Sequence, residues 1–181
     1  MPRFFPALLI FSLALNECLA SEGDDQANAF ARIYASLCLK NLQNLEGLRE
    51  KLKPMPALPP DKAALFLGGY QGDAWPVPDK YGTFVLALPR GKNFCAVHVR
   101  KADTETATRL FTAMVSNAPA PLTVKQVKNE QGKTAANGQI QTFAYEWSVP
   151  NATRKMLFTL MTASSESAQL QVLGSAAIID Q

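Results

Sequence analysis

The sequence is poor in the side chains that most enzymes use for metal or nucleophile chemistry. It contains one histidine, His98, and three cysteines in 181 residues. A zinc site usually needs three or four ligands, and a catalytic triad needs its histidine beside a nucleophile and a carboxylate. The sequence also lacks G-x-S-x-G, S-x-x-K and glycine-rich phosphate-loop motifs. We therefore expect a protein that is not an enzyme and that binds neither a metal nor another cofactor.

Charge is also scarce, which argues against nucleic acid as a partner. Charged residues make up 18% of the chain and the net charge is only +3, whereas nucleic-acid binding usually demands a clustered basic patch. Hydrophobic residues make up 48%, which is enough for a real core and argues against a disordered chain. The length suits one domain, which we expect to span residues 21–181.

Residues 1–20 have the layout of a secretory signal peptide, with Arg3 before an apolar stretch and small residues ending at Ala20. The stretch is shorter than the roughly 20 apolar residues that cross a membrane, so we expect no membrane span; a buried N-terminal helix is the alternative. Cys18 resembles a lipoprotein cysteine, but Glu17 fits badly in the small-residue position before it. We therefore expect export to the periplasm without a lipid anchor.

Signal cleavage leaves two cysteines, Cys38 and Cys95. An even pair in an exported chain most simply forms one disulfide, because the compartment outside the cytoplasm is oxidising. Two buried free thiols are the alternative. We predict the disulfide.

Apolar periodicity predicts three helices of two turns or more. Apolar residues recur at three- and four-residue steps in 26–40 and, more briefly, in 45–52. Asp103 can cap a third amphipathic helix that runs to Val115. A short helical turn is expected at 61–66, between a proline-rich connector and Gly68.

Alternating or apolar runs predict six strands, in which short turns favour antiparallel pairing. These strands span 83–88, 94–100, 122–127, 140–149, 155–162 and 168–179, and a polar loop at 128–138 is expected after the third of them. The order predicts an α+β domain: an antiparallel sheet of about six strands with N-terminal helices and one helix inserted after the first hairpin. In the second strand, His98 and Arg100 should lie on the face opposite Cys95, because alternate residues point to opposite faces.

Residues 69–82 have no sustained period, and their glycines, prolines and aromatics predict an irregular loop. Trp75 either plugs the core or anchors an interface, where aromatic side chains are favoured. His98 is either a structural histidine or one contact on a binding face. The candidate partner-binding residues are Tyr70, Asp73, Trp75, Asp79, Lys80, Tyr81, His98 and Arg100.

Three segments carry a resemblance to a known group of proteins: FLGGYQGDAW, YGTFVLAL and NFCAVHVR, together with a short signal and an early helical cysteine. Over residues 26–127 the chain resembles a family of small exported proteobacterial (lipo)proteins. Some members look like immunity proteins encoded beside type VI secretion effectors, including lipases that act in the periplasm. The resemblance implies a periplasmic immunity or inhibitor protein whose partner is a secreted effector, and it transfers no catalytic residue.

Two other functions stay open. The chain could be a cell-envelope binding module for a small ligand, a lipid or a cell-wall fragment, which predicts an apolar cavity beneath the sheet. An enzyme that uses scattered carboxylates such as Asp73, Asp79 and Glu146 has the least support, because two such groups must meet across the fold. The sequence predicts no oligomeric state.

Overall fold

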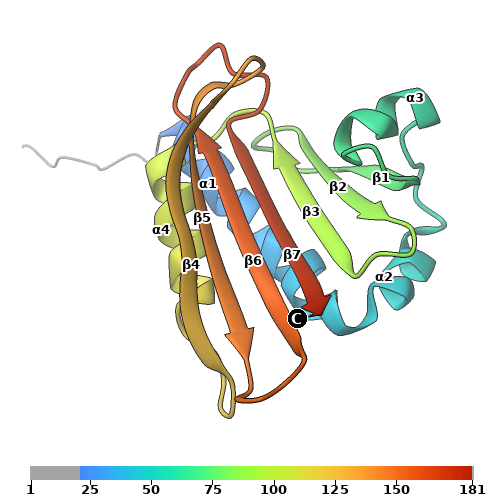
Figure 1. Cartoon of the computed structure of the whole chain (residues 1–181). Helices are drawn as coiled ribbons and strands as arrows, with labels where there is room; N and C mark the ends of the chain where they lie inside the picture. The colour runs from blue at the N-terminus through green and yellow to red at the C-terminus, as the bar shows by residue number, and fades with distance from the viewer. Residues whose placement is uncertain (1–20, 181) are drawn as a thin grey trace, which may run out of the picture.

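The computed structural model describes residues 21–180, so the predicted signal peptide and Cys18 lie outside the described residues. Figure 1 shows helices and strands that form two layers. The helical segments are α1 (Glu22–Ile33), the π-helix η1 (Tyr34–Leu39), η2 (Leu42–Asn44), α2 (Leu45–Leu52), α3 (Pro60–Ala63), η3 (Ala64–Phe66) and α4 (Thr104–Val115). The strands are β1 (Gly72–Val77), β2 (Phe84–Pro89), β3 (Phe94–Val99), β4 (Thr123–Thr134), β5 (Gly138–Ser148), β6 (Arg154–Ala163) and β7 (Val172–Asp180).

The strands form one antiparallel sheet in the order β1-β2-β3-β7-β6-β5-β4. This arrangement confirms the α+β prediction, with α4 inserted between β3 and β4. The last strand, β7, returns to the middle of the sheet and joins the N-terminal strands to the C-terminal ones. Side chains of β3 and β7 are therefore neighbours although about 80 positions separate them in the chain.

Two segments predicted as loops belong to the edge strands of the sheet. Residues 72–77 form β1, whose Pro76 is exposed and costs no ladder hydrogen bond on an edge strand. Residues 128–134, predicted as a polar loop, extend β4. An edge strand pairs on one side only and can be polar on both faces, so neither segment shows the alternation of a covered strand.

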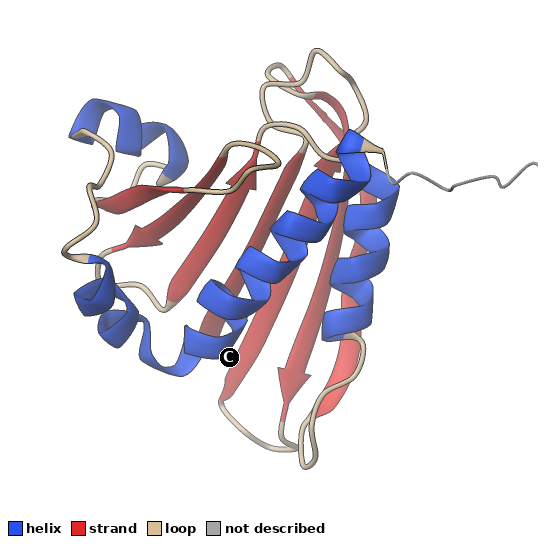
Figure 2. Ribbon diagram, turned by 180° about the vertical axis from the view of Figure 1, so that it is seen from behind, coloured by secondary structure: helices blue, strands red, loops and turns tan. Residues whose placement is uncertain are grey.

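Helices α1 and α4 cover one face of the sheet, which we call the inner face (Figure 2). Ser21 and Asp24 form a capping box at the start of α1, and Asp103 caps α4 through the backbone N–H of Thr106. Phe30 of α1 packs so closely on β7 that a side-chain carbon at Gly174 would lie 2.6 Å from its ring. Small residues therefore set how closely α1 approaches the sheet.

The predicted disulfide is present, because Cys38 of η1 bonds to Cys95 of β3. Both cysteines are fully buried and their Cα atoms lie 5.5 Å apart. The bond ties the helical layer to the sheet within the main core, around Tyr34, Phe111 and Phe158.

The opposite face of the sheet, which we call the outer face, is covered only in part. Ala63 of α3 and Leu67 pack on Ala74, Val85 and Ala87 in a second, smaller hydrophobic cluster. Within residues 21–180, no helix lies over the outer face of β4–β7 (Figures 1 and 2). The outer face is therefore the part of the sheet that remains open to a partner or ligand.

Candidate functional site

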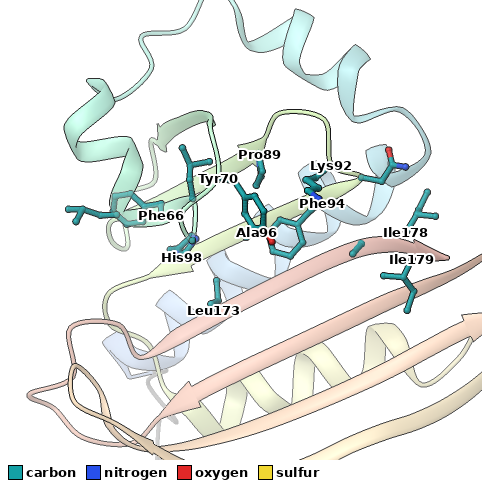
Figure 3. A pocket seen from close by; sticks show the side chains of 15 residues that line it. Phe66, Tyr70, Pro89, Lys92, Phe94, Ala96, His98, Leu173, Ile178 and Ile179 are labelled. Atoms are coloured by element: carbon teal, nitrogen blue, oxygen red, sulfur yellow. The ribbon is translucent and has the colours of Figure 1, made fainter. Parts of the chain in front are cut away.

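The outer face carries an apolar cavity of about 450 Å³ between η3 and strands β3 and β7 (Figure 3). This volume lies in the range of about 300–1,000 Å³ that small-molecule sites occupy. We call it the η3–β7 cavity, and its main lining side chains are Phe66, Tyr70, Phe94, Ala96, His98 and Leu173.

The alternation of two neighbouring strands builds the floor of the η3–β7 cavity. Phe94 pairs with Ala177, and His98 pairs with Leu173, so all four side chains point to the outer face. The alanine at 177 leaves space where a larger side chain would fill the floor. The η3 turn then ends at Gly68 and Gly69, whose positive φ angles of 58° and 86° suit glycine. This turn brings Leu65 and Tyr70 to the rim, where both are exposed.

His98 lies at one end of the η3–β7 cavity with its ring edge against Phe66, at a centroid distance of 5.1 Å. Its Nε2 atom is buried and has no hydrogen-bond partner among the described residues. Burial lowers the pKa of His98 to about 4, and a hydrogen bond to the backbone of Phe66 offsets part of that effect. The ring is therefore uncharged at neutral pH.

Lys92 supplies the charge of the η3–β7 cavity, whose lining includes no carboxylate. Its Nζ atom lies 5.2 Å from the centre of the Tyr70 ring, which is a cation–π distance. A second cavity of about 370 Å³ shares Phe66 and His98 with the first, and its one charged lining residue is Arg100. Each cavity therefore has a single cation in its lining, but the lining of the second cavity also includes the polar side chains of Thr83 and Gln169.

Of the eight candidate binding residues, three lie together on the outer face: Tyr70, His98 and Arg100. The prediction that His98 and Arg100 lie away from Cys95 is correct for His98, which lines the outer cavities while Cys95 is in the main core. Arg100 follows β3 and lines the second cavity.

Trp75 is not an interface anchor, so that prediction is wrong. The indole is only 4% exposed and packs in the main core, opposite Leu86 of β2. Strand alternation in β1 turns it inward, which is the alternative that the sequence left open.

Asp73 has a structural role that the sequence did not indicate. Its carboxylate accepts hydrogen bonds at 2.9 Å from Arg49 of α2 and at 2.9 Å from Arg90 after β2. Arg49 also donates to the carbonyls of Leu88 and Pro89. The aspartate therefore holds α2 against the β1–β2 end of the sheet.

Asp79, Lys80 and Tyr81 lie apart from the cavities, beside α1. Asp79 pairs with Arg32 of α1 at 2.6 Å, and Lys80 lies 4.6 Å from the centre of the Tyr81 ring. Tyr81 packs against the main core. These residues therefore do not share one surface with Tyr70.

The three carboxylates considered for catalysis are not brought together. Asp73 and Asp79 are in the ion pairs given above, and Glu146 of β5 pairs with Lys155 of β6 at 3.2 Å. Within the described residues, no group of three or more His, Cys, Asp or Glu side chains is placed to hold a metal ion.

The network around Asp73 supports a stability prediction. We expect Asp73→Asn to lower the free energy of unfolding by about 1–2 kcal/mol, because it weakens two charge-assisted hydrogen bonds, one to the largely buried Arg49 and one to the exposed Arg90. Urea unfolding measures this loss. The matched control is Glu50→Gln, which breaks an exposed pair with Lys53 and should change stability by less than about 0.5 kcal/mol. Equal effects of the two substitutions would contradict this role for Asp73.

Sequence analysis missed most of the lining of the η3–β7 cavity. Phe94 and Leu173 were assigned to strands, but nothing local shows that β3 and β7 are neighbours or that Phe66 folds over them. The available signal was the alternation of Leu173, Ser175, Ala177 and Ile179, which marks a second apolar or small-residue face on β7.

No helix within residues 21–180 is long and apolar enough to cross a membrane. Comparison of the chain with protein-family models, with curated proteins and with solved structures finds no match.

Proposed function

We propose that the protein is a periplasmic inhibitor that binds and neutralises a secreted antibacterial toxin, as an immunity protein of a type VI secretion effector does. The observation that supports this proposal is the open outer face, where Tyr70 and Leu65 are 56% and 75% exposed at the rim of an apolar cavity. Interface energy concentrates in aromatic anchors such as Tyr70 beside desolvated pockets, and Leu65 adds apolar area that a partner can cover at the same rim.

The disulfide is compatible with the proposed compartment. Disulfides persist where the surroundings are oxidising, as in the bacterial periplasm, and the Cys38–Cys95 bond lies inside the main core. A stable scaffold is what an inhibitor needs, because it acts by surface complementarity rather than by turnover.

Co-expression with the product of the neighbouring gene tests this function. The neighbouring product, directed to the periplasm, should arrest growth alone and should be harmless and co-purify when this protein is present. Equal growth with and without this protein would overturn the proposal.

Two matched variants locate the contact surface. We expect Leu65→Asp to weaken toxin binding at least tenfold, because it places a charge on an apolar anchor at the rim. Val127→Asp makes the same change at an exposed apolar residue of β4 and should leave affinity unchanged. Titration of the purified pair measures both, and equal losses would exclude the cavity rim as the contact.

A second function, a cell-envelope binding module for a small ligand or lipid, is favoured by the η3–β7 cavity itself. Its size, apolar lining and few polar groups are typical of a small-molecule site. A ligand that binds only the folded protein would raise its unfolding temperature.

A further inference from the structure

We propose that the η3–β7 cavity binds a medium-chain fatty-acid anion, with the acyl chain along β3 and β7 and the carboxylate at Lys92. This inference rests on the second proposed function, the small-ligand module, and names its ligand class. It requires no protein partner.

The shape of the cavity floor suits a narrow, flexible chain. The floor follows the paired strands from His98 and Leu173 to Phe94 and Ala177, four residues along each strand (Figure 3). At the rise of an antiparallel strand this distance is about 13 Å. A second cavity adjoins this end on the other side of Phe66 and His98, but its lining includes Thr83, Arg100 and Gln169, so the apolar floor ends at His98 and Leu173.

The lining gives the two ends of the cavity different chemistry. Lys92 lies in the turn just before Phe94, at the end of the cavity away from His98. Among the described residues Lys92 has no carboxylate within ion-pair distance, and its ammonium rests near the Tyr70 ring. The His98 end is uncharged at neutral pH and is closed by Phe66 and Leu173.

This polarity selects an anionic amphiphile. A carboxylate at Lys92 gains a charge-assisted contact, whereas the methyl end of the chain meets only apolar side chains and a neutral imidazole. A cationic amphiphile would meet Lys92 without a compensating acid in the lining. Amphiphiles with the same alkyl chain are therefore expected to differ in affinity for the cavity according to the charge of their head group.

The test is calorimetric titration of the purified protein with laurate below its micelle concentration. We expect saturable binding of one laurate per chain, binding of 1-dodecanol at least tenfold weaker, and no binding of dodecyltrimethylammonium. Saturable laurate binding with this preference supports the proposal. No laurate binding overturns both the proposal and the small-ligand function, whereas equal binding of laurate and dodecanol overturns only the fatty-acid assignment.

Three substitutions test whether laurate binds in the η3–β7 cavity. Lys92→Glu should weaken laurate binding at least tenfold, and Lys133→Glu, an exposed lysine on β4, should leave it unchanged. Ala177→Phe should abolish binding of both laurate and dodecanol by filling the floor. If Ala177→Phe does not fold, the pair of lysine variants decides, and equal laurate affinity of both lysine variants overturns the proposed site.

Discussion

Removal of the Cys38–Cys95 disulfide is expected to lower the free energy of unfolding by about 4 kcal/mol, because the bond closes a loop over a sequence separation of 57. The cross-link restricts the unfolded chain, and loop-entropy arguments make this effect larger for longer loops. Both cysteines are fully buried, so the bond joins segments that are already packed together in the folded protein. A loss of this size is a large share of the 5–15 kcal/mol that a typical domain has.

Guanidinium unfolding of the wild type and of the Cys38→Ala/Cys95→Ala variant measures this loss. Added reductant should destabilise the wild type toward the level of the variant and should have no effect on the variant itself. Equal stability of the oxidised wild type and the variant would contradict a stabilising role for the bond.

Acid is expected to destabilise the protein through His98, by up to about 3 kcal/mol at pH 4 and below. Burial lowers the folded-state pKa of His98 from 6.5 to about 4, so between these values the unfolded chain binds a proton that the folded protein does not. The stability that the protein gains from keeping His98 uncharged is therefore fully present above about pH 6.5. It falls as the pH is lowered and is lost near pH 4.

The surroundings of His98 explain why the protonated ring gains no compensation. Phe66, Val85 and Leu173 surround it from three elements, and the charged side chains that share its two cavities are the cations Lys92 and Arg100. A charged imidazole would therefore be buried without an acid in either lining.

Urea unfolding at about pH 7 and about pH 5 checks the contribution of His98. We expect the wild type to lose about 2 kcal/mol more than His98→Leu over this interval, because leucine keeps the apolar packing but does not titrate. The carboxylates occur in both proteins, so their titration cancels in the comparison. An identical pH dependence of the two proteins would contradict a depressed pKa for His98.

Local sequence signals predicted the helices well. The apolar stripes of α1 and α4 are short-range features, and Asp103 caps α4 as predicted. The structure adds Ser21 as the capping residue of α1 and a π-helix at its end, which holds Cys38. The sequence also predicted the strands that pack against the helices on the inner face, because alternate residues along each of these strands are apolar.

Local sequence signals did not predict the first edge strand or the composition of the binding surface. Residues 72–77 contain a proline and lie inside the segment 69–82 that was predicted as a loop, so their pairing with β2 is visible only once the sheet exists. The predicted contact residues lie in different parts of the structure, because their positions also depend on long-range packing. Tyr70 lies on the outer face, Trp75 is buried in the main core, and Asp79 forms an ion pair with Arg32 of α1.

By itself, the sequence determined the α+β class and the Cys38–Cys95 pair, since periodicity and cysteine number depend on neighbours along the chain or on composition. Only the tertiary structure decided where the cavity lies. Placing β7 between β3 and β6 brings Leu173 beside His98. The side chains that line the cavity are far apart in the sequence, and the strand order brings them together. Local sequence patterns do not reveal the strand order.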